Sequence, residues 1–377
     1  MNAFFLAVCR TALLSAVLAV VVGCANGRDT PKPADLAPSA GLIGIRAAWN
    51  AKLEPVQFPL AVNVNGDSVS VVSSSGALKS LNARTGATLW SANVGAPISA
   101  GIGGDGHLAA VLTVENELVV FEKSDELWRQ TIAAQGYTAP LVAGGRVFLL
   151  AADRSVLAFD ARTGQKLWSQ QRAGDSLVLR ESGVLLAVGN TLVVGLSGKL
   201  VGLNPSNGAV LWDVAISTPR GTNEIERLVD LVGKASRGGD VVCVRSFQSA
   251  LGCVDAARGR LLWVKAAFGS VGLDGDEQRI YGVEGNGELV AWSRVDGARV
   301  WATERLRFRR LTAPLVLGRS IVVGDDAGMV HWLSREDGSP LAHMPTDGSA
   351  ITVAPVLASG TLVVVTRNGG IYGFQPE

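Results

Sequence analysis

The sequence predicts an all-β protein, an eight-bladed β-propeller with four antiparallel strands in each blade. Three observations predict this fold. A motif that ends in tryptophan recurs about every 40 residues, short strand-like runs fill each period, and the two ends of the chain carry the two halves of one more repeat. Four strands repeated with this period are typical of propellers. The 377 residues are also enough to bury a large core.

The repeated motif joins a turn to a tryptophan. Clear copies are "LNARTGATLW" ending at Trp90, "FDARTGQKLW" at Trp168, "LNPSNGAVLW" at Trp212, "VDAARGRLLW" at Trp263 and "WSRVDGARVW" at Trp301. In two degraded copies, "VFEKSDELW" reaches Trp128 without its glycine, and "LSREDGSPLA" has Leu341 where the tryptophan is expected. Counted from Trp49, the intervals are 41, 38, 40, 44, 51, 38 and 40 residues.

Gly164, Gly208 and Gly297 are expected to give the turn a backbone conformation that a side chain would oppose. Each tryptophan is expected to bury its ring against the next blade and so fix the angle between blades. The repeated residues therefore belong to the scaffold.

One period contains four strand-like segments. Residues 137–170 read "YTAPLVAGG", "RVFLLAADR", "SVLAFDARTG" and "QKLWSQ", each an apolar run bounded by turn residues. No window of ten or more residues after the N-terminal segment carries a helical stripe, which favours an all-β fold.

Eight innermost strands are predicted, beginning near Pro59, Pro97, Pro140, Val184, Leu228, Val271, Pro314 and Pro355. The last blade lacks a strand, because "IYGFQPE" ends the chain, whereas the Trp49 segment has no blade before it. We expect the N-terminal strand to complete the last blade and cover its edge.

The N-terminus predicts a lipid anchor. Arg10 precedes the apolar run "TALLSAVLAVVV", which is too short to span a bilayer comfortably, and "VVGC" follows like a bacterial lipobox. We expect residues 1–23 to be a lipoprotein signal peptide, Cys24 to be lipidated, residues 24–41 to form a flexible tether and residues 42–377 to form the propeller. Ala25 replaces the aspartate of inner-membrane retention, which favours the periplasmic face of the outer membrane.

Charge and cysteine content narrow the function classes. The 34 basic and 33 acidic residues give no excess that would indicate nucleic acid as a partner. Cys243 and Cys253 are expected opposite each other on neighbouring strands, either as a disulfide or as two buried thiols. No metal site is predicted from these cysteines and the distant His107, His331 and His343.

Three other motifs favour structural roles. "RLRFRR" (305–310) is expected on a solvated face or in salt bridges between blades. "GIGGDG" (101–106) has no helix behind it and is not expected to bind phosphate. Asp325 and Asp326 are expected in a hairpin turn.

Two segments depart from the repeat. The interval from Trp212 to Trp263 is the longest, so its extra residues must form an insertion between blades. In "GDSLVLRES", Leu177 and Leu179 lie between polar Ser176 and Arg180, as an apolar anchor beside a cationic side chain would. Alternatively, both leucines belong to the first strand of a blade.

The repeat resembles that of pyrroloquinoline-quinone enzymes, and nearly the whole chain after the signal peptide resembles the BamB family. The resemblance rests on the lipobox, the tether, the eight repeats, "GTNEIERLVDL" (221–231) and "LTAPLVLGRSIVVGDDAGMVHWLSREDG" (311–338). It implies a non-enzymatic scaffold lipoprotein of the outer-membrane β-barrel assembly (BAM) complex. The implied partners are a polypeptide-transport-associated (POTRA) domain of BamA, other BAM subunits and, as a further candidate class, unfolded outer-membrane proteins.

The resemblance also implies contact residues for BamA. Its first contact loop is matched by Leu177, Leu179 and Arg180. Its second contact loop is matched by Glu224, Ile225, Glu226, Arg227 and Leu228, followed by the carboxylate of Asp230. Val232 stands where the family pattern has a second carboxylate, so this chain departs from the pattern in the acidic part of that contact.

Two alternatives stay open: a periplasmic quinoprotein-like enzyme and a ligand-binding propeller. Quinoprotein dehydrogenases often carry a disulfide between adjacent cysteines, whereas Cys243 and Cys253 are ten residues apart. Quinone stacking would also need Trp292 or Trp332 to face the channel. No catalytic residue and no cofactor are predicted.

Overall fold

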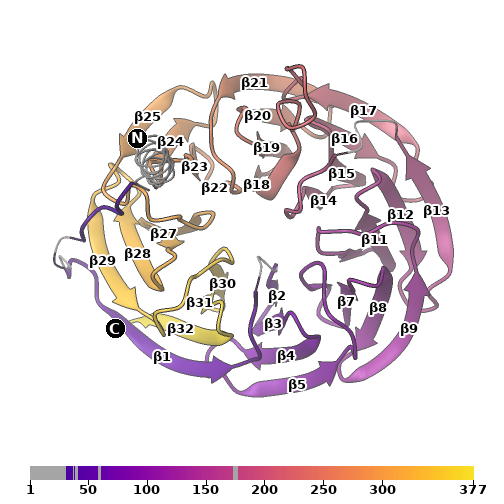
Figure 1. The fold of residues 1–377 in the computed structure, drawn as a ribbon, viewed down its shortest axis with the longest axis horizontal. Coiled ribbons are helices and arrows are strands. Elements are labelled where there is room, and N and C mark those ends of the chain that lie inside the picture. The colour runs from indigo at the N-terminus through magenta and orange to yellow at the C-terminus, as the bar shows by residue number, and fades with distance from the viewer. Residues whose placement is uncertain (1–30, 37, 39–40, 58–60, 173–176) are drawn as a thin grey trace, which may run out of the picture. The chain divides into compact units, whose positions relative to one another are not determined.

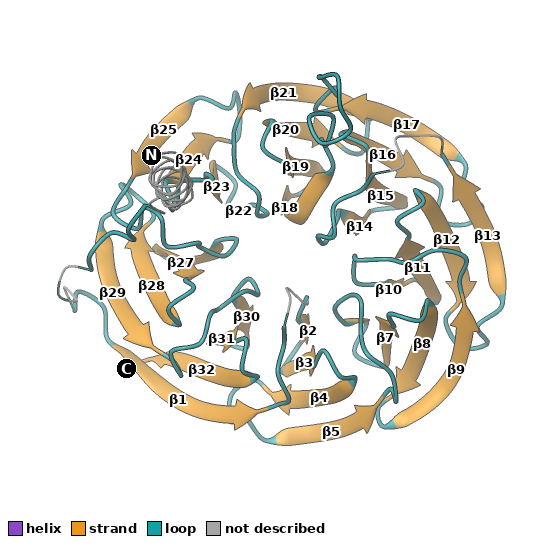
Figure 2. Cartoon of the chain, in the orientation of Figure 1, coloured by secondary structure: helices purple, strands orange, loops and turns teal. Residues whose placement is uncertain are grey.

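The strands of this protein form eight separate antiparallel sheets of four, arranged radially around one axis (Figure 1). The computed structural model describes residues 31–36, 38, 41–57, 61–172 and 177–377. The chain divides into residues 1–33 and a propeller unit, residues 34–377, and the predicted signal peptide and Cys24 lie outside the described residues. All regular secondary structure in the described ranges is β-strand, which confirms the predicted eight-bladed propeller (Figure 2).

The first four blades follow the chain in order, from the innermost to the outermost strand. Their strands are, for blade 1, β2 (Asn63–Asn65), β3 (Ser68–Val72), β4 (Ala77–Asn82) and β5 (Thr88–Asn93); for blade 2, β6 (Gly103–Gly104), β7 (Leu108–Leu112), β8 (Glu117–Glu122) and β9 (Asp125–Thr131); for blade 3, β10 (Leu141–Ala143), β11 (Arg146–Leu150), β12 (Ser155–Asp160) and β13 (Lys166–Gln171); and for blade 4, β14 (Leu185–Val188), β15 (Thr191–Leu196), β16 (Lys199–Leu203) and β17 (Val210–Ala215).

The other four blades continue in the same order until the last, which takes its outer strand from the N-terminal part of the chain. Their strands are, for blade 5, β18 (Leu231–Gly238), β19 (Val241–Ser246), β20 (Ala250–Asp255) and β21 (Arg260–Ala266); for blade 6, β22 (Asp274–Gly275), β23 (Arg279–Val283), β24 (Leu289–Ser293) and β25 (Arg299–Thr303); for blade 7, β26 (Leu315–Leu317), β27 (Ser320–Gly324), β28 (Met329–Ser334) and β29 (Pro340–Pro345); and for blade 8, β30 (Val356–Ala358), β31 (Thr361–Val365), β32 (Gly370–Pro376) and β1 (Ile45–Lys52).

Blade 8 closes the ring as predicted. β1 pairs antiparallel with β32 from Ile45 opposite Pro376 to Lys52 opposite Gly370. The first and last strands of the propeller are therefore neighbours in one sheet, which leaves no open seam between the ends of the chain (Figure 1).

The turn glycine and the tryptophan of the repeat meet across blade boundaries. Gly164, with φ +71°, lies against the indole of Trp128 from the preceding blade, and an added Cβ would come within 2.7 Å of that ring. The same indole donates a hydrogen bond of 2.9 Å from Nε1 to the carbonyl of Ala161 in the turn. Gly208 and Gly297 lie under Trp168 and Trp263 in the same way. This geometry confirms the predicted scaffold role and explains why turn and tryptophan recur together.

The copy in blade 7 corrects one detail of the sequence alignment. Between the third and fourth strands of the blades, the register shifts by one residue, and in blade 7 the shift falls between Trp332 and Leu333. Leu341 is therefore the extra residue of the bulge, and Ala342, opposite Trp332, takes the tryptophan position. An aromatic ring still fills this boundary, because Trp332 packs edge-on against Phe374 of blade 8.

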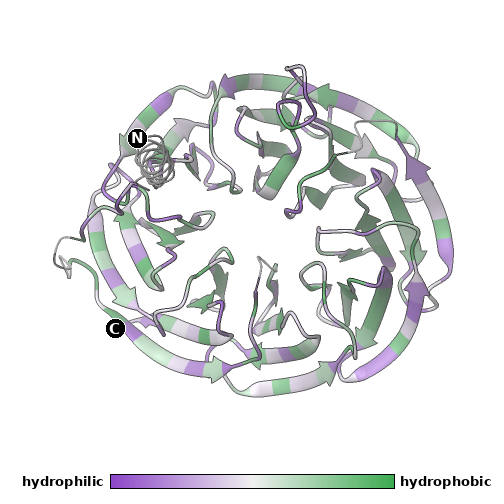
Figure 3. Cartoon of the chain, in the orientation of Figure 1, coloured by the Kyte–Doolittle hydropathy of each residue, from purple (hydrophilic) through white to green (hydrophobic). Residues whose placement is uncertain are grey.

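The core lies between adjacent sheets. The second and third strands of the blades are largely apolar and buried, whereas the outermost strands alternate between exposed and half-buried residues (Figure 3). Seven apolar clusters hold the blades together, and the one between blades 7 and 8 contains Val322, Leu362 and Phe374. Each blade thus depends on its neighbours for its core.

Blade 5 carries both cysteines of the fold. Cys243 on β19 lies directly opposite Cys253 on β20, and a disulfide joins them across the hairpin. Both side chains are buried in the cluster that packs blade 5 against blade 6.

Part of the segment predicted as a tether contacts the propeller. The amide of Ala34 donates to the carbonyl of Arg307 at 2.9 Å, and Arg309 Nε donates to the carbonyl of Ala34 at 2.9 Å. The side chain of Leu36 is partly buried against the apolar cluster of blades 6 and 7. We therefore propose that the tether ends before Ala34 rather than at residue 41.

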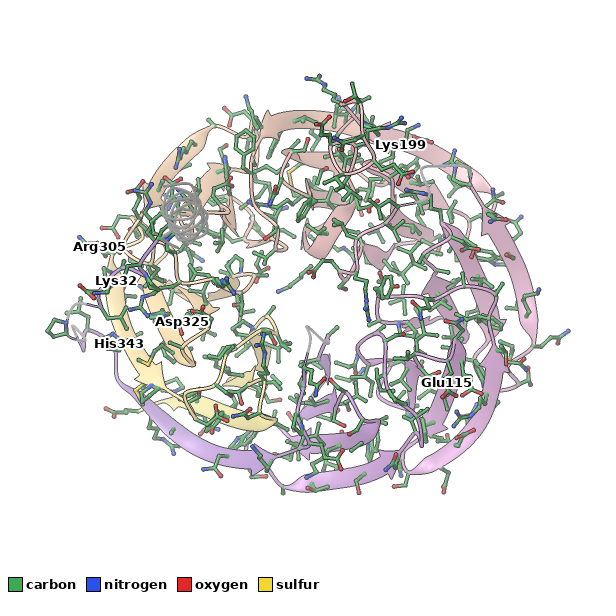
Figure 4. All side chains as sticks on the ribbon, viewed as in Figure 1. Lys32, Glu115, Lys199, Arg305, Asp325 and His343 are labelled. Atoms are coloured by element: carbon green, nitrogen blue, oxygen red, sulfur yellow. A yellow bond between two sulfur atoms is a disulfide. The ribbon has the colours of Figure 1, made fainter. Side chains whose placement is uncertain are left out.

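A buried polar network in blade 7 holds Arg309 in place. Asp325 Oδ2 accepts bonds of 2.9 Å from Arg309 and His331, while Oδ1 accepts the amides of Ala327 and Met329, the turn role expected for this aspartate. Burial opposes ionisation of Asp325, but these hydrogen bonds hold its pKa below the ordinary value. Asp325 and His343 lie in the same blade (Figure 4). His343 is paired with His331 across the strands β28 and β29.

Membrane-spanning helices were also sought in the described residues. None of the described segments forms a helix that is long and apolar enough to cross a bilayer.

Candidate functional site

Two connections that depart from the repeat form the candidate site. One runs from β13 to β14, between blades 3 and 4, and the other from β17 to β18, between blades 4 and 5. In antiparallel blades, such connections emerge on the same face as the hairpins between second and third strands. The two connections therefore open on one face of the ring, near β17 and β18 in Figure 2.

The two connections are joined where they enter their blades. Gly183 and Val232 form an antiparallel bridge, and the amide of Gly233 donates to the carbonyl of Ser182 at 2.7 Å. The segments predicted separately from the sequence thus lie side by side in the structure.

The first connection carries Leu177, Leu179 and Arg180. β14 begins only at Leu185, so the structure rejects the alternative that these leucines belong to the first strand of a blade. Leu177 is 37% exposed, and Leu179 is half-buried. The exposed Arg180 guanidinium lies 5.6 Å from the ring centroid of Tyr137, a cation–π contact that orients its charge.

The second connection carries Glu224 to Asp230. Ile225 is 75% exposed, an unusual position for an isoleucine. The loop keeps its shape through Glu226, whose carboxylate accepts the Thr222 amide while its own amide donates to Asn223 Oδ1, each at 2.9 Å. The Thr222 hydrogen bond lowers the pKa of Glu226. The Glu226 side chain therefore stabilises the loop that presents Ile225.

Asp230 connects the two loops. Its Oδ2 accepts a 3.0 Å hydrogen bond from the amide of Leu179, and its Oδ1 lies 3.6 Å from Nη1 of Arg154. Arg154 also donates to the carbonyl of Leu177 at 3.3 Å and to the hydroxyl of Ser197. The carboxylate of Asp230 is thus engaged within the site.

The outer surface of the site combines exposed apolar and exposed charged side chains. Ile225 and Leu177 are its exposed apolar side chains, and Leu228 is half-buried beside Leu177 in a small depression that both loops line. The exposed charged residues in the described parts of the two connections are Arg180, Glu181, Arg220, Glu224, Glu226 and Arg227. Apolar anchors within a polar rim are characteristic of protein–protein interfaces.

Sequence reasoning missed two residues of the site. Tyr137 supports Arg180 from the preceding connection, and its hydroxyl is fixed by Gln135 at 2.7 Å. Arg154 is 7% exposed and lies in the β11–β12 hairpin. The sequence could have indicated Arg154, because the equivalent turn position is occupied by glycine in four other blades. Val232, where the family pattern has a carboxylate, is 2% exposed and belongs to β18.

The two tryptophans that quinone stacking would require do not fit that use. Trp292 and Trp332 are buried on β24 and β28, the third strands of blades 6 and 7, away from the innermost strands. Trp292 packs in the core with Trp263. Among the described residues, no group of three or more His, Cys, Asp or Glu side chains is placed to hold a metal ion.

Comparison with known proteins identifies the family. The family model described as "Outer membrane protein assembly factor BamB" matches residues 74–303, more than half of the chain. The protein of that name from Burkholderia pseudomallei is 34% identical over 368 residues, covering 96% of this chain and 97% of the relative. This chain belongs to the BamB family. The BamB relative from Bordetella pertussis is 32% identical, with 96% of each chain covered.

Solved structures support the same architecture. BamB from Moraxella catarrhalis superposes with a TM-score of 0.80 at 22% identity, covering 88% of this chain and 99% of that one. Quinohemoprotein alcohol dehydrogenase from Comamonas testosteroni gives a TM-score of 0.69 at 15% identity, covering 90% of this chain and 78% of that one. At these identities both likenesses concern the fold alone, which the BamB family shares with enzymes.

Proposed function

We propose that this protein is a non-enzymatic scaffold lipoprotein that assists the folding and insertion of outer-membrane β-barrel proteins. In this proposal, Cys24 carries the lipid anchor, and the propeller lies on the periplasmic face of the outer membrane. The partners are a periplasmic POTRA domain of BamA and other subunits of the same complex. Relatives named as outer membrane protein assembly factors support this role.

The observation that carries the proposal is the convergence of the two non-repeat connections. In a chain built from similar blades, the segments that depart from the repeat are free to serve contacts outside the fold. Here both departures meet at Asp230 and expose Leu177 and Ile225 on one face. An exposed isoleucine and leucine on connections that also carry exposed charges fit a protein partner better than a small ligand.

A scaffold role is favoured over a quinoprotein-like activity. The two tryptophans that could stack a quinone are used in the core between blades. The only described cysteines, Cys243 and Cys253, form a disulfide across a β-hairpin, ten residues apart in sequence.

The test replaces the exposed face of the site and measures co-purification of BamA from native membranes. One variant combines Leu177→Ala, Leu179→Ala and Arg180→Ala, and a second is Ile225→Asp. The matched control is Val295→Asp, because Val295 is 82% exposed but lies in a β24–β25 turn at the other face of the ring.

Both site variants should lose BamA while keeping membrane association and the thermal midpoint of the parent, and the control should retain BamA. Co-purification that survives both site variants would reject the proposed surface.

A further inference from the structure

Arg154 occupies a backbone position that the repeat normally gives to glycine. In seven blades the hairpin between the second and third strands closes with the same bond, from an amide to the carbonyl three residues earlier. In six of them the residue that donates this bond has positive φ: Gly76, Gly287, Gly328 and Gly369 in four blades, Asn116 at +63° in blade 2, and Arg154 at +65° in blade 3. In blade 5 Ser249 donates the bond, and the positive φ falls on Gln248 before it. A long side chain is unfavourable in this left-handed conformation.

From this unfavourable backbone position, the side chain of Arg154 extends into the candidate site. From the hairpin of blade 3, the guanidinium reaches the carbonyl of Leu177, the hydroxyl of Ser197 in blade 4 and the carboxylate of Asp230 before blade 5. Its side chain is 8% exposed. One buried cation thus touches both loops of the site, and the planar fork of arginine suits several acceptors at once. Strained residues of this kind are concentrated at functional sites.

Asp230 completes the arrangement from the other side. Its carboxylate faces Arg154 with one oxygen and accepts the Leu179 amide with the other. The carboxylate therefore links Arg154 to the backbone of the first loop, and its side chain is 20% exposed. This geometry gives Asp230 a positioning role within the site, in addition to the partner contact expected from the family pattern.

We propose that Arg154 and Asp230 form an internal clamp that holds the Leu177–Arg180 loop and the Ile225-bearing loop together as one preformed docking surface. Arg154, whose side chain is 8% exposed, is a positioning residue that the partner does not touch, and Asp230 holds the two loops from the other side. The inference rests on the proposed function for the identity of the partner. It predicts that the clamp affects partner affinity by fixing the conformation of the loops.

The decisive variant is Arg154→Gly, which restores the residue that the turn prefers. A residue needed only for the fold would lower the thermal midpoint when replaced. If Arg154 acts as a clamp, we expect two results for this variant. Its thermal midpoint should equal or exceed that of the parent, and its Kd for the purified periplasmic domain of BamA should rise about tenfold or more. The matched control is Asn116→Gly, the same change in the same turn of blade 2, which should leave the Kd unchanged.

Double variants separate positioning from contact. Asp230→Ala combined with Arg154→Gly should weaken binding no more than the worse single variant, because both remove the same clamp. Ile225→Ala combined with Arg154→Gly should give fold-changes that multiply, because Ile225 is assigned to direct contact. Multiplying effects for Arg154 and Asp230 would overturn the clamp.

Hydrogen exchange tests the clamp without any partner. The amide of Leu179 donates to Asp230, so its exchange should accelerate at least about tenfold in Asp230→Ala, and amides of the same loop should exchange faster in Arg154→Gly. If the parent fails to bind the BamA domain but these amides respond, the proposed function fails and the clamp stands. Unchanged exchange in both variants, or parental Kd in Arg154→Gly, would overturn the clamp.

Discussion

The contact between turn glycine and tryptophan gives the sharpest stability prediction, for Gly164→Ala. Alanine at φ +71° costs about 1 kcal/mol of backbone strain. Its Cβ would also lie 2.7 Å from Cδ2 of Trp128, about 1 Å closer than an ordinary carbon contact. Moving the indole weakens its 2.9 Å hydrogen bond to Ala161, about 1 kcal/mol, and disturbs the packing by a further ~1–2 kcal/mol. The expected loss of unfolding free energy is about 3–4 kcal/mol.

The assay is urea unfolding followed by far-ultraviolet circular dichroism, with Gly189→Ala as the control. Gly189 also has positive φ, +53°, but an added Cβ meets nothing within 4 Å. The control should therefore lose only the strain, about 1 kcal/mol. In a Trp128→Ala background, the effect of Gly164→Ala should fall to that of the control. Equal destabilisation by Gly164→Ala and Gly189→Ala in the parent would refute the reasoning.

Three further predictions concern buried groups. Cys243→Ala should lower the unfolding free energy by about 3 kcal/mol, the entropy of a ten-residue loop, and intact mass after alkylation should show no free thiol there in the oxidised parent. Glu284→Gln should cost about 3 kcal/mol in thermal unfolding, because it leaves the Arg245 guanidinium, 3.1 Å away and fully buried, without its counter-charge; a loss below about 1 kcal/mol would contradict this. Burial first, and then His331, lowers the pKa of His343, so folding favours its neutral form and stability falls as pH drops below 6.5. His343→Gln should flatten that decline in melting curves, and an unchanged pH profile would argue against the assignment.

The blade architecture could be predicted from sequence because it is periodic. Each turn glycine and tryptophan recurs at nearly constant spacing, and the Trp49 segment supplies the strand that the last blade lacks. A period-two strand pattern with turn residues at fixed offsets constrains local structure strongly. In blade 7 the sequence alignment misplaced the tryptophan position by one residue, at Leu341, because no aromatic side chain marks it; the register, with the same bulge as in the other blades, places Ala342 there.

The organisation of the site could be predicted only in part. Family resemblance and departures from the repeat indicated both loops, but not that Asp230 bonds to Leu179 across 51 residues of chain. Contacts between connections of different blades leave no local periodicity, so Arg154 and Tyr137 were not recognised as members of the site. The docking of Ala34 on Arg307 is equally non-local.

The measurement that tests the proposed function most directly is site-specific photo-crosslinking in intact cells. A photoreactive phenylalanine analogue placed at position 225 should crosslink to BamA, and one placed at position 295 should not, although both native side chains are highly exposed. A crosslink to BamA from position 295 together with none from position 225 would contradict the account.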